Sequence, residues 1–359
     1  QYCVSDMGRG LCDALTPSNR LEDVLRMQQE TEEAHSLLSY LGGMPMIPFT
    51  DVRTALHLAQ IGSSLSPRAL MDVGACLRAS RAAREAIVTD KTDTPLMSAN
   101  ASRLATFKTI EQAISDAIIS EDEIADRASN ELFQIRRKMR ACNERVRERL
   151  NGMIHNPNFQ KYLQDAIITM RADRYVLPVR QEYRSMVPGI VHDQSSTGAT
   201  VFIEPMSVVE IGNELKQLIS AEKAEIERIL RMLSAQIAPE ADAIADNLAI
   251  LAQLDFAFAK ASLARQMNGC MPKINDEGRG NIVRGRHPLI DPQKVVPLDI
   301  RLGTDFTTLI ITGPNTGGKT VTLKTTGLFT LMAQSGLQVP ADYGTELAVF
   351  DDVFADIGD

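Results

Sequence analysis

Residues 313–320 read Gly-Pro-Asn-Thr-Gly-Gly-Lys-Thr, and this octapeptide constrains the fold more than any other part of the chain. It matches the phosphate-binding-loop pattern G-x-x-x-x-G-K-[ST]. The six residues before it, 307–312, are mostly β-branched, which predicts a short buried strand. The residues after it, 321–334, predict a helix. A strand, a glycine-rich loop and a helix in this order predict a phosphate-binding α/β core.

The chemistry of phosphate binding explains the residue types in this loop. Glycines let backbone N–H groups surround an anion closely, and the helix that follows adds its positive end. The Lys319 ammonium is expected to reach the β and γ phosphates, and the Thr320 hydroxyl is expected to bind Mg²⁺. A glycine-rich turn without a ligand is the alternative. The predicted nucleotide-binding residues are Gly313, Pro314, Asn315, Thr316, Gly317, Gly318, Lys319 and Thr320.

The length and composition of the chain exclude several classes of protein. A chain of 359 residues is too long for one ordinary core, which predicts two or three domains. The formal net charge is −8, so any contact with nucleic acid must come from local basic patches. The five cysteines form no C-x-x-C pair and the five histidines show no metal-ligand spacing, which argues against a zinc site. Scattered thiols and the absence of a long apolar run predict a cytoplasmic protein without a membrane partner.

Apolar residues recur at helical spacing through the first 128 residues, which predicts a helical core. The expected helices are 28–41, 51–61, 67–87 and 101–119. A longer helix is expected over 129–152, with Ser129 as its N-cap. Its apolar seam has the heptad spacing of a helix that packs on a partner helix: Leu132, Ile135, Met139, Cys142 and Val146.

The partner helix is expected at 207–237. Ser207 and Glu210 match a capping box at its start. The two long helices are predicted to pair antiparallel as a rod. The basic stretch 136–149 on the first of them has two explanations, which are a charged helix surface and contacts with nucleic-acid phosphates.

Between the two long helices the hydrophobic period changes to that of short strands. The expected strands are 166–170, 174–179, 187–192 and 199–203. Polar and glycine-containing turns separate them, which predicts a small antiparallel β clamp at the tip of the rod. Its arginines are expected to contact backbone phosphates without reading sequence: Arg171, Arg174, Arg180 and Arg184.

The predicted fold is multidomain and mostly helical, with a small antiparallel β clamp followed by the first part of an α/β P-loop ATPase domain. Its expected parts are a helical core (1–128), a first lever helix with the entry to the clamp (129–170), the β clamp (171–206), a second lever helix with the return to the core (207–272), and the N-terminal part of the ATPase domain (273–359). No apolar strand ending in Asp-Glu follows the loop. The acidic candidates lie at or beyond the end of a short strand expected at 347–350, which predicts an interrupted ATPase domain: Asp351, Asp352, Asp356 and Asp359.

Several motifs resemble the MutS family of DNA-binding ATPases. The sequence Gly-Pro-Asn-x-Gly-Gly-Lys after Leu-Ile-Ile-Thr is similar to the loop of that family, and Arg-His-Pro-Leu at 286–289 is similar to the segment that leads into its ATPase domain. Thr316 and Thr320 stand where mismatch-repair members typically have Met and Ser, and in this the chain resembles the second bacterial branch (MutS-two). The clamp stretches 174–179, 189–193 and 198–205, and the segment 350–359, are also similar to that branch.

The resemblance implies lever helices, a clamp, and an ABC-type ATPase that uses ATP and Mg²⁺ and forms a homodimer. By alignment of the segment before the loop, Val295 and Val296 are expected to pack on the adenine, with core strand packing as the alternative. The branch lacks the mismatch-reading domain, so the resemblance implies binding of branched or structured double-stranded DNA in the control of recombination. Phe202-Ile203-Glu204 matches the Phe-x-Glu of mismatch-repair members, but its place in the clamp favours strand packing.

The resemblance leaves two alternative functions open. One is an ATPase that binds stalled or collided ribosomes through rRNA, and the other is a structural coiled-coil interaction arm. Members of the branch usually continue with the acidic catalytic residue, which would lie beyond Asp359, and with a small Smr nuclease domain. The resemblance therefore implies an ATPase and endonuclease in the full-length protein, and a fragment that binds ATP without turning it over.

Overall fold

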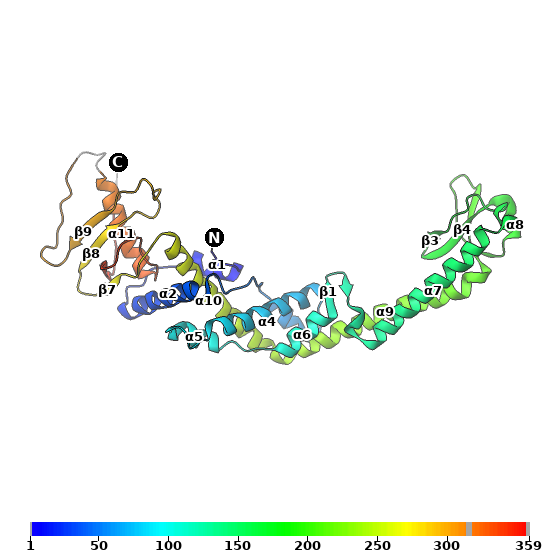
Figure 1. Cartoon of the computed structure of the whole chain (residues 1–359), viewed down its shortest axis with the longest axis horizontal. Coiled ribbons are helices and arrows are strands. Elements are labelled where there is room, and N and C mark those ends of the chain that lie inside the picture. The colour runs from blue at the N-terminus through cyan, green and yellow to red at the C-terminus, as the bar shows by residue number, and fades with distance from the viewer. Residues whose placement is uncertain (1, 314–317, 357–359) are drawn as a thin grey trace. The chain divides into compact units, whose positions relative to one another are not determined.

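Residues 2–313 and 318–356 are described by this computed structural model, and they form two units that each have their own core. Unit 1 comprises residues 1–61, 72–111 and 237–359, and unit 2 comprises residues 62–71 and 112–236. Each unit is therefore built from segments that are far apart in the sequence, as the colours of Figure 1 show. No helix within these described residues has both the length and the apolar character needed to cross a bilayer.

The helix α10, Ala241–Gln266, is the centre of unit 1. Buried residues such as Leu248, Leu254 and Phe258 occur all around it, as expected of a helix that is covered on every side. The helices that cover it are α1 (Asp6–Asp13), α2 (Leu21–Leu41), α3 (Arg53–Gln60) and α5 (Pro95–Ser102). Two further helices begin in one unit and end in the other: α4 (Pro67–Ile87) and α6 (Lys108–Ala117).

A buried carboxylate on α10 attaches the N-terminal segment. Asp255 is fully buried, and its oxygens accept hydrogen bonds from the backbone N–H groups of Val4 and Ser5, both at 3.0 Å, and from the Ser5 hydroxyl at 2.6 Å. The same hydroxyl accepts a bond from the Gly8 N–H at 2.9 Å and so caps α1. A Cβ at Gly8 would lie 2.3 Å from Oδ2 of Asp255, so only glycine leaves room for this contact.

Replacing Asp255 by alanine is expected to destabilise unit 1 by about 2–3 kcal/mol, because three donors lose a buried, charged acceptor. Urea unfolding measures the change in free energy, and hydrogen exchange of α1 locates it. Asp246→Ala is the matched control, since Asp246 is an exposed carboxylate on the same helix. Equal stability of the two variants would show that Asp255 does not attach the N-terminal segment to α10.

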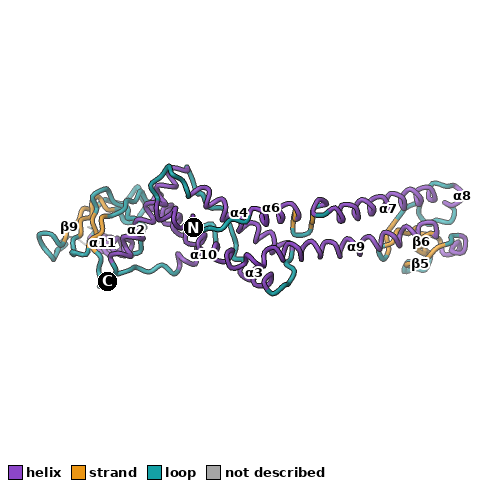
Figure 2. Tube along the Cα trace, turned by 90° about the horizontal axis from the view of Figure 1, so that it is seen from below, coloured by secondary structure: helices purple, strands orange, loops and turns teal. Residues whose placement is uncertain are grey.

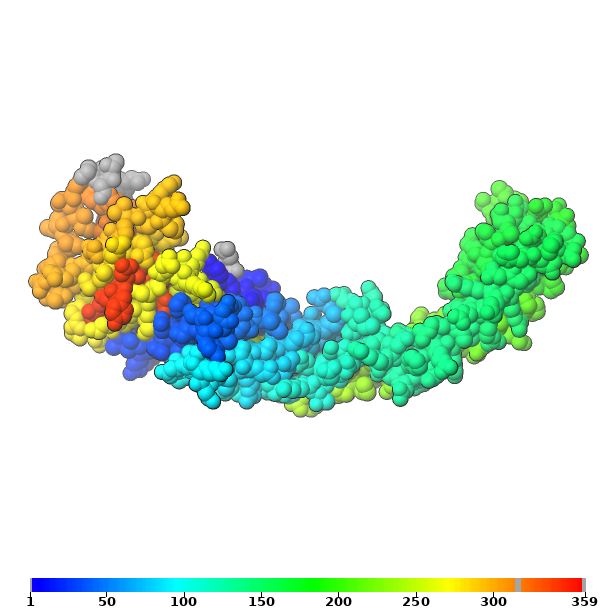
Figure 3. All heavy atoms as spheres, in the orientation of Figure 1, coloured from blue at the N-terminus to red at the C-terminus, as the bar shows by residue number. Residues whose placement is uncertain are grey.

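Unit 1 also contains a four-stranded sheet. Its strands are β7 (Lys273–Asn275), β8 (Gly280–Gly285), β9 (Leu298–Leu302) and β10 (Glu346–Ala348), in the order β7-β10-β8-β9. β10 is parallel to β7, and the other pairs are antiparallel. Helix α11, Lys319–Gln334, packs Phe329 and Met332 against Ile282 of β8 and Leu347 of β10. Figure 3 shows the C-terminal residues, in red, against the yellow and blue parts of unit 1.

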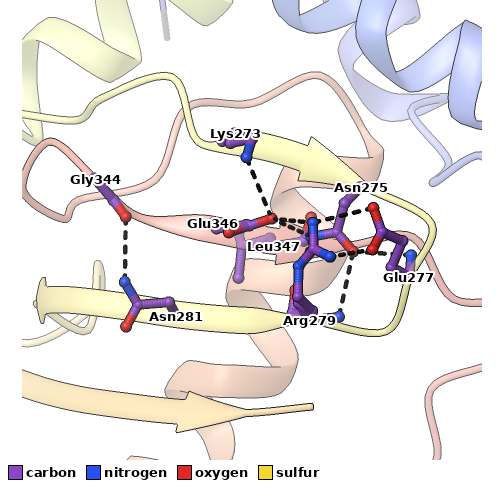
Figure 4. A network of polar contacts seen from close by, with 8 residues as sticks. All are labelled: Lys273, Asn275, Glu277, Arg279, Asn281, Gly344, Glu346 and Leu347. Atoms are coloured by element: carbon purple, nitrogen blue, oxygen red, sulfur yellow. Dashed lines mark hydrogen bonds and ion pairs between the residues drawn. The ribbon is translucent and has the colours of Figure 1, made fainter. Parts of the chain in front are cut away.

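Asn275 shapes the turn between β7 and β8, as Figure 4 shows. Its Oδ1 accepts hydrogen bonds from the backbone N–H groups of Glu277 at 3.0 Å and Arg279 at 3.2 Å. Its Nδ2 donates to Oε1 of Glu346 on β10 at 3.0 Å. The Glu346 carboxylate also lies 3.8 Å from the Lys273 ammonium, so one amide and one carboxylate tie β7 to β10 and to the turn that leads into β8.

Two long antiparallel helices form the body of unit 2: α7 (Asn130–Ile154) and α9 (Met206–Ile237) (Figure 2). Contacts along them run in opposite chain directions, since Ser129 donates to Glu225 at 2.6 Å and Arg149 donates to the Ser207 carbonyl at 2.6 Å. Ser129 is the N-cap of α7, as predicted, and accepts a bond from the Leu132 N–H at 2.9 Å. Four of the five predicted seam residues are buried and the fifth is half-buried: Leu132, Ile135, Cys142, Val146 and, half-buried, Met139.

The predicted four-stranded antiparallel sheet is also present in unit 2. Its strands are β3 (Thr169–Arg171), β4 (Arg174–Arg180), β5 (Gly189–Gln194) and β6 (Thr200–Pro205), in the order β3-β4-β6-β5. Leu177 and Ile203 of the sheet share one apolar core with Leu150 of α7 and Ile211 of α9. A smaller hairpin, a short helix and two 3₁₀ turns complete the unit: β1 (Ile118–Ser120), β2 (Glu123–Ile124), η1 (Asp126–Ala128), α8 (Pro157–Gln160) and η2 (Gln181–Met186).

Two helix predictions were wrong. The helix expected over 101–119 is interrupted, because the Asn247 side chain of α10 accepts from the N–H of Ala105 at 2.9 Å and donates to its carbonyl at 2.8 Å. This amide takes the backbone bonds that a continuous helix would need. The predicted capping box is absent because α9 begins at Met206, which places Ser207 inside its first turn. The Ser207 hydroxyl donates instead to the sulfur of Met153 at 3.7 Å.

The buried strand expected at 307–312 was also wrong. These residues form no strand and are mostly exposed, with Ile310 81% exposed. A strand needs a neighbour for its N–H and C=O groups, and among the described residues no strand pairs with this segment. The strand expected at 347–350 is present at Glu346–Ala348, two residues shorter at its C-terminal end.

Candidate functional site

The described ends of the glycine-rich loop have the backbone that the sequence requires. Gly318 has φ +80°, in the left-handed region that favours glycine, and it is the N-cap of α11. Gly313 at the other end has φ +145°. The Lys319 ammonium donates to the Gly313 carbonyl at 2.6 Å and so joins the two ends. The remaining loop residues lie outside the described part of the chain: Pro314, Asn315, Thr316 and Gly317.

The first turn of α11 offers donors next to this loop. The first N–H groups of an α-helix have no partner within the helix, and its N-terminus carries a partial positive charge. Thr320 is exposed, and within the described residues its hydroxyl has no hydrogen-bond partner. By contrast, the Thr322 hydroxyl donates to the Gly318 carbonyl at 3.0 Å and the Thr325 hydroxyl to the Val321 carbonyl at 2.6 Å. Thr320 is therefore the hydroxyl in this turn that is open to a ligand.

The opposite end of α11 is held by α2. The last carbonyls of a helix lack partners in the helix itself. Gln28 is fully buried, and its Nε2 donates to the carbonyls of Ala333 and Leu337, both at 2.9 Å. The Thr31 hydroxyl donates to the Gly336 carbonyl at 2.7 Å. The helix that follows the loop is thus fixed to the helical part of unit 1. Sequence reasoning missed these residues, although a Gln and a Thr inside an amphipathic helix are a signal for such contacts.

The two residues expected at the adenine have different surroundings. Val296 is 81% exposed, and Val295 is half-buried in the wall of a 610 Å³ cavity. That cavity reaches Leu328 in the second half of α11. Leu328 is nine residues beyond Lys319, or about 13 Å along the helix at 1.5 Å per residue. Val295 therefore shares a cavity with the second half of α11, and its packing on an adenine stays a prediction.

The four predicted clamp arginines fall into two pairs. Arg174 is largely buried and is bound by Glu204 at 3.2 Å and by Asn213 at 2.7 Å. Arg171 lies 3.2 Å from the Asp193 carboxylate, and its guanidinium stacks over the Phe202 ring at 4.2 Å. The second pair is exposed, and within the described residues neither side chain has a partner: Arg180 and Arg184.

Glu204 is the carboxylate that binds both Arg174 and His192 within the sheet. Its side chain is 2% exposed, and it accepts from Arg174 and lies 2.7 Å from Nε2 of His192. A Cβ at Gly212 of α9 would lie 2.6 Å from the Glu204 carboxylate, which allows the helix to approach it closely. Phe202 and Glu204 are therefore strand residues, in agreement with the strand packing favoured for the Phe-x-Glu tripeptide.

Arg180, the last residue of β4, and Arg184, in η2, have two tyrosines close to them along the backbone. The backbone N–H of Arg180 donates to the Tyr162 carbonyl at 3.0 Å, and the rings of Tyr162 and Tyr183 are 5.4 Å apart. The Lys161 ammonium lies 5.0 Å from the centre of the Tyr162 ring. We call these residues the tip cluster: Lys161, Tyr162, Arg180, Tyr183 and Arg184. The sequence analysis identified its arginines but not its aromatic residues, which lie on two separate segments.

Three basic side chains of the stretch 136–149 on α7 are paired with carboxylates: Arg136, Arg140 and Arg145. Arg136 lies 2.7 Å from Asp126 and 2.7 Å from Glu222. Its hydrogen bond holds the pKa of Asp126 below the usual range of an aspartate. Arg145 lies 3.4 Å from Glu214. The charged-surface explanation therefore fits these arginines.

The acidic residues that the structure describes after β10 do not form a metal site. Asp351, Asp352 and Asp356 are exposed, and Asp359 lies outside the described residues. Across residues 2–313 and 318–356, no group of three or more His, Cys, Asp and Glu side chains is arranged to hold a metal ion.

Comparison with known proteins identifies the family. The model of MutS domain V matches residues 309–359, which include the glycine-rich loop and α11. A protein named endonuclease MutS2 from Alkaliphilus oremlandii is 50% identical over 359 residues, which is 99% of this chain and 45% of that protein. A protein of the same name from Alkaliphilus metalliredigens is 48% identical over 100% of this chain and 46% of its own length. Another from Clostridioides difficile is 49% identical over 99% of this chain and 45% of its own length. This chain thus spans less than half the length of these relatives. The match to MutS domain V and the identity along the whole chain show that it belongs to the MutS2 branch of the MutS family.

Proposed function

We propose that this chain is the nucleotide-gated, DNA-binding part of a MutS-type ATPase. The observation that carries the proposal is the loop, where Lys319 and Gly313 join the two ends and Thr320 is open at the start of α11. A triphosphate would lie at the N-terminal end of α11, with Lys319 on its β and γ phosphates. Mg²⁺ would be held by the Thr320 hydroxyl together with phosphate oxygens, since the acidic residues within 2–313 and 318–356 offer no metal-binding cluster.

In this proposal the helices of unit 1 respond to the nucleotide. A ligand at the first turn of α11 acts on a helix whose last turn is hydrogen-bonded to Gln28 and Thr31 of α2. α2 packs along α10, which also holds the N-terminal segment through Asp255. A rigid helix transmits a displacement at one end to its contacts at the other, so α2 is the first element expected to respond to ATP.

We place nucleic-acid binding at the tip cluster of unit 2. Exposed cations without carboxylate partners bind backbone phosphates at little desolvation cost, and Arg180 and Arg184 meet this condition as far as the described part of the chain shows. Arg171 and Arg174 are engaged by Asp193 and Glu204 and therefore serve the sheet. The partner proposed is branched or structured double-stranded DNA, with contacts that position the duplex and do not read its sequence.

Replacing Arg180 and Arg184 together by alanine is expected to weaken binding about tenfold or more and to reduce the slope of log affinity against log salt by about 2, because two phosphate contacts are lost. Fluorescence anisotropy over a salt series measures both quantities. Arg231→Ala is the matched control, since Arg231 is exposed on α9 about 37 Å along the helix from its first residue. An unchanged slope in the double variant would remove the tip cluster from the interface.

The proposal as a whole is tested by two titrations of the same protein. ATP binding is followed by calorimetry, with and without Mg²⁺. Binding of a four-way junction, a linear duplex of equal length and a structured RNA is followed by anisotropy with ATP, with ADP and without nucleotide. Tightest binding to the junction, changed by ATP, supports the proposal. Absence of ATP binding would refute it, and preference for the RNA would favour a ribosomal partner.

The relatives' name assigns an endonuclease to those proteins. We propose that nuclease activity, ATP turnover and homodimer formation belong to the whole protein in the same way, and that the present chain binds ATP with little hydrolysis. The five-part division at 1–128, 129–170, 171–206, 207–272 and 273–359 is kept as part of this proposal. Single-turnover measurements with radiolabelled ATP test it, since rapid hydrolysis by this chain would show that its residues are sufficient for catalysis.

A further inference from the structure

Two thiols near the start of the chain lie in contact. The sulfur atoms of Cys3 and Cys12 are 3.5 Å apart, and both cysteines are free. Cys3 precedes α1 and is buried, whereas Cys12 lies in the last turn of α1 and is exposed. The exposed Cys12 is therefore in contact with the buried thiol of Cys3.

The protein holds these two sulfurs together from both sides. Asp255 binds the backbone of Val4 and Ser5, directly after Cys3. The Ser5 hydroxyl caps the helix that carries Cys12. The Tyr2 hydroxyl donates to the side chain of Gln266 at the end of α10, which fixes the residue before Cys3. The contact between the thiols is thus set by a hydrogen-bonded framework.

A cavity gives small molecules access to both sulfurs. It has a volume of 320 Å³, and its walls include Cys3, Cys12 and the nearly buried Lys260 of α10. Burial lowers the pKa of the Lys260 ammonium, and the carboxylate of Glu30, 3.9 Å away, opposes this effect. A peroxide or a small disulfide can enter a space of this size.

We propose that Cys3 and Cys12 are a redox-sensitive modification site that closes to a reversible disulfide when the protein meets a hydroperoxide. A sulfur–sulfur bond is about 2.05 Å long, so the two sulfurs must approach by about 1.5 Å. Side-chain rotation supplies a movement of this size, because Cys12 is at the surface. In a reducing compartment the pair stays reduced until an oxidant appears.

The reaction has two balanced steps. The Cys12 sulfur attacks the hydroperoxide, forms a sulfenic acid and releases an alcohol, or water when the oxidant is hydrogen peroxide. The Cys3 sulfur then attacks the sulfenic sulfur, the new bond forms, and the departing hydroxide leaves as water with the proton of Cys3. Overall, two thiols are oxidised to one disulfide and one peroxide bond is reduced. An excess of a small thiol reverses the product by exchange.

The second step is expected to depend on pH. Burial, the bond to Cys12 and the nearby Asp255 raise the pKa of Cys3 to about 12. Attack requires the thiolate, whose fraction rises about tenfold per pH unit as long as the pH stays well below that pKa. Formation of the disulfide from the sulfenic acid is therefore expected to be about a hundred times faster at pH 9 than at pH 7.

The disulfide would close a ring that contains the cap Ser5 and seven of the eight residues of α1. Oxidation is therefore expected to slow amide exchange in α1 by keeping it folded against α10. This effect is independent of the proposed nucleotide site and of the tip cluster.

Trypsin makes the product easy to recognise. Cleavage after Arg9 and Arg20 places Cys3 in peptide 1–9 and Cys12 in peptide 10–20. After brief treatment of the whole chain with hydrogen peroxide, we expect the two peptides to be joined by a disulfide. The joined species should have the summed mass of the two peptides minus two hydrogen atoms, and a reductant should restore the separate peptides. Oxidation of Met7 adds an oxygen to the first peptide but cannot join it to the second.

Cys12→Ser and Cys270→Ser are the variants to compare. Cys12→Ser must abolish the joined peptide, and Cys270→Ser must leave it unchanged, because Cys270 is a half-buried thiol elsewhere in unit 1. Circular dichroism of the reduced proteins establishes that both variants fold. The proposal is overturned if wild-type Cys12 proceeds to sulfinic acid, or forms dimers between chains, while peptides 1–9 and 10–20 stay separate.

Discussion

Replacing Lys319 by alanine is expected to weaken the binding of ATP·Mg²⁺ by at least about a hundredfold, or about 3 kcal/mol, since two charge-assisted bonds to phosphate oxygens are lost. The lost ammonium also joins the loop ends through the Gly313 carbonyl, so the remaining donors are less well ordered. Calorimetric titration measures the affinity directly. Lys324→Ala is the matched control, because it removes the same charge from an exposed position on the same helix.

A second substitution separates the metal from the phosphates. Thr320→Ala is expected to reduce the gain in ATP affinity that Mg²⁺ provides, while the affinity measured without Mg²⁺ changes little. Equal ATP affinity of the Lys319→Ala and Lys324→Ala variants would move the nucleotide away from this loop. Loss of affinity in Lys324→Ala alone would do the same.

Replacing Glu204 by alanine is expected to destabilise unit 2 by about 3–5 kcal/mol, because removal of one partner leaves a buried charge uncompensated. Arg174 and His192 are only 16% and 18% exposed in their side chains, so water cannot replace the carboxylate fully. Urea unfolding measures the loss. The chain has no tryptophan, and three of its six tyrosines lie in unit 2, so tyrosine fluorescence follows the transition: Tyr162, Tyr175 and Tyr183.

Glu182→Ala is the control for this measurement, since Glu182 is an exposed carboxylate of the same unit. The Glu204 variant should lower the urea midpoint of unit 2 and leave that of unit 1 in place. A loss below about 1 kcal/mol, which is the size expected for an exposed pair, would show that Glu204 is accessible to water.

Local patterns in the sequence predicted the elements whose partners lie close by or repeat regularly. The seam of α7 and the cap at Ser129 depend on neighbouring residues, and both are present. The four strands of unit 2 alternate with turns, and they pair as expected. The Lys-Thr at the end of the loop likewise stands at the start of a helix, as its pattern requires.

Contacts between distant residues could not be predicted in this way. The interruption of the helix at 101–119 is caused by Asn247, more than a hundred residues later. Arg174 looked as available as Arg180 until β6 placed Glu204 beside it. A β-branched run such as 307–312 favours an extended conformation but does not specify the strand that must pair with it.

The attachment of α11 to α2 is made through main-chain atoms. Gln28 and Thr31 bond to the carbonyls of residues 333, 336 and 337, and every amino acid provides a carbonyl. The side chain at 337 can therefore change without loss of the hydrogen bond that its carbonyl accepts from Gln28. Position 336 is restricted by its backbone, because its φ is +71° and a Cβ there would lie 2.5 Å from that of Met27. A library randomised at 337 and at 336 should recover a range of apolar residues at the first position, where Leu337 packs against the core, and glycine alone at the second.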